Sequence, residues 1–274
     1  MSAQTINALL EKTTNWDKDE RYMATSDLIA ELQKDAKIDT NLERRICSAI
    51  LTQLDDVNND VQSIAVKCLS ILVKKVQEQQ VCDICDRLSK LIIDGKPELR
   101  DVYSNGLKTA IGVVPDHMGP QVAAKLTNRL LGGIGNDEVA EVKLECLDLM
   151  TDLLKRFGHE MDQDHGGITG IAMKQLNHAR PVVRARARTC MGWLATVIAA
   201  PQLNRITEQL LNQIEAPRAG PHDVRAQIQT IGTISRFVGY RLGSQLPRII
   251  PLFLRHLGDP EDELDVGGSA LIDA

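Results

Sequence analysis

The chain has 274 residues, and 43% of them are hydrophobic, which is enough for a continuous core without metals or disulfides. Only 3% are aromatic, so a surface that stacks bases or sugars is not expected. The formal charge of -5 argues against a nucleic-acid partner, because a surface that binds phosphates needs surplus Lys and Arg.

The amino-terminal residues, MSAQTINALLEKTTNWDKDE, are polar and acidic where a signal peptide would be apolar. No apolar run approaches the roughly 20 residues that a membrane-spanning helix needs. We therefore expect a soluble, intracellular protein with no membrane partner. In such a chain, cysteines within apolar helical patterns are expected to be reduced and buried. There are six: Cys47, Cys68, Cys82, Cys85, Cys146 and Cys190.

A repeated pattern runs through the chain. In the segment DVQSIAVKCLSIL, Val61 and Gln62 precede the small residue Ala65, and Leu69 follows four residues later. Similar segments recur with apolar anchors, or their equivalents, at positions 20, 61, 99, 142, 183, 224 and 264. A spacing of about 40 residues is typical of HEAT and armadillo repeats, each of which is built from packed helices.

Sequence patterns typical of helices and of helix starts occur in these repeated segments. Amphipathic stretches that begin at Leu42, Val81 and Leu203 are predicted to be the first helices of their hairpins. Asn59 and Gln62 are predicted to form a capping box at a second helix. Prolines at or near the first helical position are predicted to mark helix starts. These are Pro97, Pro181, Pro221 and Pro260.

The predicted fold is all-α, an α-α superhelix of HEAT or armadillo type, because no stretch alternates with the period of two that a strand requires. We expect six helical hairpins and part of a seventh over residues 1–264, followed by a divergent, unstructured tail at 265–274. Asp259 and Pro260 are predicted to start the last helix, but Gly267 and Gly268 stand where it should continue. We therefore expect a truncated product with an open apolar flank.

A lone CxxC, Cys82 and Cys85, is interpreted as part of an apolar helix face. A zinc or redox site would need further ligands at a matching spacing or a thioredoxin-like strand before the motif, and neither is present.

A cluster of metal-ligand residue types occurs in GHEMDQDHGG, but Met173 stands where an EF-hand starting at Asp162 would have its glutamate. The prediction is a solvated loop between helices, with a weak metal contact as the alternative. The cluster consists of His159, Glu160, Asp162, Asp164 and His165.

Two glycine-rich segments, LGGIGND from Leu131 and GGITG from Gly166, lack the strand and the motif of a phosphate-binding loop and are predicted to be turns. No hydrolase, zinc-protease or kinase motif is present. We expect no enzymatic activity, no cofactor and no small-molecule substrate.

The most basic segment is RPVVRARAR, in which Arg180, Arg184 and Arg188 share one helix face with Arg186 beside them. Two interpretations remain open. Side chains at the position of Arg184 could form a polar ladder between neighbouring repeats. Alternatively, the segment could be a docking patch for an acidic partner. The equivalent positions in other copies are Gln62, Arg100, Lys143 and Arg225.

The amino-acid sequences of the repeats resemble those of a known family. The segments LLEKTTNWDKDERYMATSDLIAELQKD, DVQSIAVKCLSILVKKV, LRDVYSNGLKTAIG, VKLECLDLMTDLL and ISRFVGYRLGSQLPRIIPL are similar, in order from about Asn7 to Leu264, to the amino-terminal repeats of the cullin-associated neddylation-dissociated proteins.

This resemblance implies a function. Members of the family are long HEAT solenoids that wrap around unneddylated cullin bound to its RING subunit and exchange the substrate receptors of cullin-RING ubiquitin ligases. Their amino-terminal repeats clasp the RING end of the cullin. For this chain, the resemblance implies a non-enzymatic regulator of the cytoplasm and nucleus that binds cullin and its RING subunit, without the carboxy-terminal repeats that displace the adaptor.

Candidate contact residues are charged positions assigned to the second helices of the repeats. They are Lys67, Lys74, Lys75, Arg184, Arg188 and Arg236. The alternative is a HEAT-repeat adaptor such as a karyopherin-like transport factor, which would present an acidic surface to basic cargo. A third possibility is an enzyme with its site at the cluster in 159–165.

Overall fold

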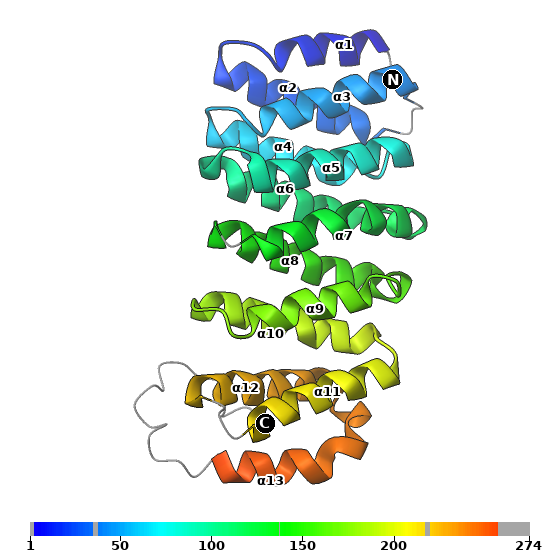
Figure 1. The fold of residues 1–274 in the computed structure, drawn as a ribbon. Coiled ribbons are helices and arrows are strands. Elements are labelled where there is room, and N and C mark those ends of the chain that lie inside the picture. The colour runs from blue at the N-terminus through cyan, green and yellow to red at the C-terminus, as the bar shows by residue number, and fades with distance from the viewer. Residues whose placement is uncertain (1–2, 35–37, 137, 217–219, 257–274) are drawn as a thin grey trace.

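A computed structural model of the chain describes residues 3–34, 38–136, 138–216 and 220–256, and these form a stack of antiparallel helical hairpins without a strand (Figure 1). The first helices of the hairpins are α1 (Ala3–Lys12), α3 (Thr40–Gln53), α5 (Glu78–Asp94), α7 (Gly119–Gly135), α9 (His165–Gln175), α11 (Ala200–Glu215) and α13 (Leu246–His256). The second helices are α2 (Lys18–Leu32), α4 (Asn59–Leu72), α6 (Arg100–Val113), α8 (Ala140–Phe157), α10 (Pro181–Val197) and α12 (Pro221–Val238). The prediction of an all-α solenoid is confirmed.

The two sets of helices form two layers. Second helices pack on one another in the order α2, α4, α6, α8, α10 and α12, and first helices from α1 to α9 do the same. Between α9 and α11 there is hardly any contact, so α10 and α12 hold the last hairpin to the stack. Figure 1 shows the hairpins following one another from α1 at one end to α13 at the other. Among the described helices, none has both the length and the apolar character needed to cross a membrane.

The core lies between the layers and follows the repeated pattern. Val61, Ala65 and Leu69 of α4 are fully buried, and so are Val142 and Cys146 of α8. Residues four apart lie on one face of a helix, so the repeated anchor and small residue face the same neighbours in each hairpin. Five of the six cysteines are buried and Cys82 is half-buried, and all six are free thiols.

The glycine-rich segments are not turns, so that prediction is wrong. Gly132 and Gly133 lie inside α7, and Gly166 and Gly167 lie inside α9. A Cβ atom at Gly133 would stand 2.3 Å from Sγ of Cys146 on α8. The missing side chain lets α7 and α8 approach closely, and this packing outweighs the low intrinsic helix propensity of glycine.

The predicted capping box is also wrong. The helix cap is Asn58, whose Oδ1 accepts hydrogen bonds from the backbone N–H groups of Asp60 and Val61 at 2.9 and 3.2 Å. Nε2 of Gln62 instead donates to the carbonyl of Asp56 at 2.6 Å, in the preceding turn. The cap is thus one residue earlier than predicted, at Asn58, whose side-chain oxygen satisfies two backbone N–H groups of the first turn.

Prolines do mark helix starts at three of the four predicted places. Pro181 and Pro221 are the first residues of α10 and α12. Pro97 opens the short 3-10 helix η1 (Pro97–Leu99) that leads into α6. The fourth, Pro260, lies outside the described residues, together with Asp259, Gly267, Gly268 and the tail 265–274.

Candidate protein-binding surface

The six candidate contact residues form two separate groups. Lys67 is exposed on α4, whereas Lys74 and Lys75 lie in the turn after that helix, so their assignment to a helix was wrong: α4 ends at Leu72. Arg184 and Arg188 are on α10 and Arg236 is on α12. Helices α6 and α8 lie between the two groups, which corresponds to about 25 to 30 Å at the usual spacing of packed helices.

Arg184 has a structural role within its own repeat. Its Nη1 donates to the carbonyls of His178 and Ala179 at 2.8 and 2.9 Å. Arg21, at the equivalent position of the first repeat, donates in the same way to the carbonyls of Asn15 and Trp16, both at 2.9 Å. These arginines satisfy carbonyl groups that the turn between two helices leaves without a helical partner.

A polar ladder between repeats is present at other copies of this position. Arg21 also pairs with Asp56 of the second repeat, with Nε at 2.6 Å from Oδ2. Lys143 is almost fully buried in α8, and its Nζ lies 2.9 Å from Oε1 of Gln175 at the end of α9. The ladder interpretation therefore holds for Arg21 and Lys143, whereas the hydrogen bonds of Arg184 stay within its repeat.

Two of the other three arginines of the basic segment pair with the preceding repeat. Arg180 lies 2.8 Å from a carboxylate oxygen of Glu141, and Arg186 lies 3.1 Å from one of Asp148, which Lys108 of α6 also approaches at 3.7 Å. The charges of these side chains are thus compensated across α6, α8 and α10.

Arg188 is different, because it is half-buried and has no hydrogen bond or ion pair with any described residue. A Cβ atom at Gly192 would stand 2.8 Å from the ring of Phe237 on α12, so this face of α10 packs against α12. Arg188 lies on the same face, one turn before Gly192. Burial lowers the pKa of Arg188, and the charges of Arg184 and Arg236 lower it further. Three guanidinium groups therefore gather at the α10–α12 seam, and we call these three residues the arginine seam.

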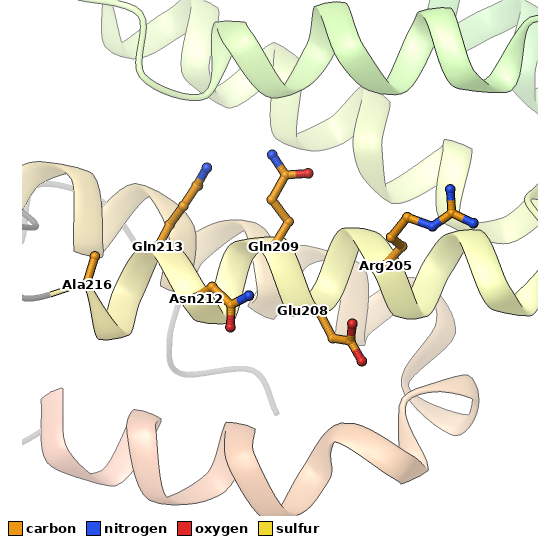
Figure 2. A pocket seen from close by; sticks show the side chains of 6 residues that line it. All are labelled: Arg205, Glu208, Gln209, Asn212, Gln213 and Ala216. Carbon is orange, nitrogen blue, oxygen red and sulfur yellow. The ribbon is translucent and has the colours of Figure 1, made fainter.

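Two of the hollows on the described surface lie beside α12 and along α11. One, of about 420 Å³, lies between the α9–α10 turn and the start of α12, and its lining includes Arg184, Arg225 and Asp223. The other runs along α11 and is lined by exposed side chains of that helix and by Ala216, which directly follows it (Figure 2). Figure 2 shows Glu208 and Asn212 pointing toward α13 and the other long side chains pointing away from it. Small-molecule sites bury most of their ligand, which one exposed helix face cannot do.

The cluster predicted as a solvated loop is partly buried, so that prediction is wrong for His165. This side chain is 2% exposed at the start of α9, and its Nε2 lies 2.8 Å from the carbonyl of Gly158. Residues Gly158–Glu160 form the short 3-10 helix η3. His165 thus anchors the connection between α8 and α9. No group of three or more His, Cys, Asp and Glu side chains in the described part of the chain is placed to hold a metal ion.

The CxxC pair lies on α5, as the apolar pattern predicted. Burial raises the pKa of the Cys85 thiol to about 12, and burial also raises the pKa of Cys82. A redox or metal-binding cysteine needs an accessible thiolate, and an elevated pKa disfavours it.

Sequence reasoning missed two exposed apolar residues. The side chains of Trp16 and Val57 are 90% and 96% exposed, in the turns before α2 and α4. Each directly precedes the N-cap residue of its helix, Asp17 or Asn58. This shared position before a cap was the signal available in the sequence.

Comparison with known proteins identifies relatives that are longer than this chain. It is 37% identical over 255 residues to cullin-associated NEDD8-dissociated protein 1 of Arabidopsis thaliana, in a match that covers 92% of the chain and 21% of that protein. The chain is a relative of the amino-terminal portion of these proteins. The protein of the same name from Drosophila melanogaster is 38% identical over 263 residues, which is 94% of the chain and 21% of the relative.

The cullin-associated NEDD8-dissociated proteins are longer, and the chain spans about a fifth of the length of the curated relatives it matches first. A protein of Emericella nidulans described as the N-terminal part of cullin-associated NEDD8-dissociated protein 1 is 24% identical over 294 residues. That match covers 96% of the chain and 86% of the relative. No family model matches the chain.

Solved structures support the same fold. The karyopherin Kap121p, bound to the SUMO protease Ulp1p, matches 95% of the chain and 28% of its own length with a TM-score of 0.66 and 13% identity. A chain from a structural study of microtubule plus-end tracking by XMAP215, CLIP-170 and EB1 matches 82% of this chain and 89% of its own with a TM-score of 0.54 and 14% identity. At such identities the likeness shows a helical solenoid and does not favour a transport function.

Proposed function

We propose that the chain is a non-enzymatic regulator of cullin-RING ubiquitin ligases, which binds unneddylated cullin together with its RING subunit in the cytoplasm and nucleus. Relatives at 37% and 38% identity are cullin-associated by name, which supports cullin as the partner. The single structural observation that carries the proposal is the uncompensated Arg188 in the arginine seam, because the surrounding repeats pair most of their buried charges.

An acidic segment of the partner would fit the arginine seam. Arg188 has a guanidinium group with no described partner, and the charges of Arg184 and Arg236 are close enough to perturb its pKa. A carboxylate placed there would gain charge-assisted hydrogen bonds and relieve repulsion among three like charges. Hydrogen bonds to charged groups contribute about 1.5 to 3 kcal/mol each, so one such carboxylate would be a substantial contact.

Lys67, Lys74 and Lys75 form the second proposed contact. All three are exposed at one end of the stack, three second-layer helices away from α10. A partner that touches both groups must extend along the second layer over about 25 to 30 Å. This span suits a large folded partner such as a cullin-RING complex better than a short peptide.

The test is the dissociation constant of the chain for purified, unneddylated cullin with its RING subunit. Arg188→Glu should weaken binding at least tenfold, which corresponds to about 1.4 kcal/mol, because it replaces an attractive charge with a repulsive one. Arg205→Glu is the matched control, because it makes the same change of net charge. Arg205 is exposed on α11, in the other layer of helices. The control should leave the dissociation constant within twofold.

Thermal unfolding of both variants shows whether either has lost its fold. The proposal is wrong if the unaltered chain does not bind at micromolar concentration. The assignment of the arginine seam is wrong if the two charge reversals have equal effects.

A further inference from the structure

Two neighbouring turns at the amino-terminal end of the stack present apolar side chains to solvent. Trp16 and Val57 occupy equivalent places in the first and second repeats, directly before the N-cap residues Asp17 and Asn58. With exposed fractions of 90% and 96%, neither side chain contributes to the core. Tryptophan is buried on average, so its near-complete exposure here has no explanation in the stability of the fold.

The two turns are tied to each other through Arg21. Its Nη1 donates to the carbonyls of Asn15 and Trp16, while its Nε and Nη2 donate to the carboxylate of Asp56 at 2.6 and 2.8 Å. The same carboxylate accepts the backbone N–H of Asn58 at 2.8 Å. One guanidinium group thus fixes the backbone next to both exposed side chains. A surface held in place before binding loses less conformational entropy when a partner docks.

The surroundings of this pair are acidic. Segments 15–21 and 55–60 contain six carboxylates and two basic side chains, and one of the two, Arg21, is already paired with Asp56. Asp17, Asp19 and Asp60 stand at the starts of α2 and α4, where carboxylates also stabilise the helix ends. Stabilising the helix ends explains these aspartates, but it does not explain the two apolar residues that precede them, one in each turn.

We propose that Trp16 and Val57, with Asp19 and Asp60, form a docking site for a basic segment of the partner. An aliphatic side chain of that segment packs on Trp16 and Val57, and a Lys or Arg beside it lies over the indole ring and near the carboxylates. The inference rests on the proposed function, because the segment is assigned to the cullin-RING complex. The acidic site at the starts of α2 and α4 and the basic arginine seam at α10 and α12 then help to fix the orientation of the partner, since these two sites accept opposite charges.

The experiment measures binding of unneddylated cullin with its RING subunit to the Trp16→Ala/Val57→Ser variant. We expect at least tenfold weaker binding with an unchanged melting temperature, because both side chains are solvent-exposed. Tyr240→Ala is the matched control: this aromatic side chain is 85% exposed in the short 3-10 helix η4 (Gly239–Arg241), after the last second helix. It should leave binding within twofold.

A second variant, Asp19→Asn/Asp60→Asn, tests the charge of the segment. It should weaken binding and reduce the dependence of the dissociation constant on salt, since two attractive charges are removed. If only the Trp16→Ala/Val57→Ser variant weakens binding, the docked segment is not basic and the inference is wrong. If the unaltered chain binds and the apolar variant binds equally well, the inference fails while the proposed function stands. If the unaltered chain does not bind, both fail.

Discussion

Arg21 and Asp56 join the first two repeats through a two-pronged ion pair, with Nε–Oδ2 and Nη2–Oδ1 distances of 2.6 and 2.8 Å. Their side chains are only 12% and 9% exposed. Burial alone would raise the pKa of Asp56, but the hydrogen bonds from Arg21 and from the backbone of Asn58 outweigh it, so the pKa of Asp56 lies below its usual value. The pair therefore stabilises the contact between repeats while Asp56 is ionised.

Replacing Asp56 by Asn should lower the free energy of unfolding by about 2 kcal/mol at pH 7, because Arg21 loses its charged partner. The folded-state pKa of Asp56 is below the unfolded value of about 3.9, so this contribution is present above that pH and is lost as the pH falls through the folded-state pKa. Urea unfolding of both proteins at pH 7 and pH 3 measures it. A difference of equal size at both pH values would contradict the account.

Gly133 and Gly132 should respond in opposite ways to the same substitution. Gly133→Ala places a Cβ atom against Sγ of Cys146 and should destabilise the protein by about 1 to 3 kcal/mol through overpacking. Gly132→Ala meets no atom within 4 Å and should stabilise it by about 0.5 to 1 kcal/mol, since alanine is the better helix former. Thermal melts of the two variants compare them. Two changes of the same sign would show that α7 does not pack on α8 in this way.

Arg156 donates hydrogen bonds to backbone carbonyls at the end of a neighbouring helix, and the planar fork of its guanidinium group allows it to reach two of them. Nη1 donates to the carbonyl of Ile111 and Nη2 to that of Val114, both at 2.9 Å, where α6 ends. Lysine has one donor group instead of a planar fork, so Arg156→Lys should cost about 1 kcal/mol although the charge is kept. Chemical denaturation quantifies the loss. Unchanged stability would mean that water replaces these contacts without cost.

The native protein should show one readily labelled thiol. Burial raises the pKa of five cysteines to about 12, whereas Cys82 is half-buried. At pH 8, a thiol-specific reagent should modify Cys82 first and the others only after denaturation. Mass spectrometry of the labelled peptides identifies the order. Early labelling of Cys85 would indicate that α5 opens in the native state.

The sequence predicted the architecture well because helix periodicity is local and repeats itself. Val61, Ala65 and Leu69 carry the core pattern of a whole hairpin, and similar copies in other repeats make the period visible. Details that depend on a partner elsewhere in the chain were missed. Gly133 was taken for a turn residue because its contact, Cys146, lies on the next helix.

The candidate surface was predicted only in part, for the same reason. The basic segment was visible in the sequence, but the ion pairs of Arg180 and Arg186 with the preceding repeat could not be read from it. Arg188 is distinguished from them only by the lack of a described partner in the folded chain. Trp16 follows no helical period, because it belongs to a turn, and its exposure is set by how the turn is held.

Binding of a cullin-RING complex by this chain through the arginine seam can be tested by a direct titration. Biolayer interferometry would follow immobilised chain and unneddylated cullin with its RING subunit, with the unaltered chain, Arg188→Glu and Arg205→Glu compared side by side. We expect saturable binding at micromolar concentration or below, weakened at least tenfold by Arg188→Glu alone. No saturable binding, or equal binding by all three chains, would contradict it.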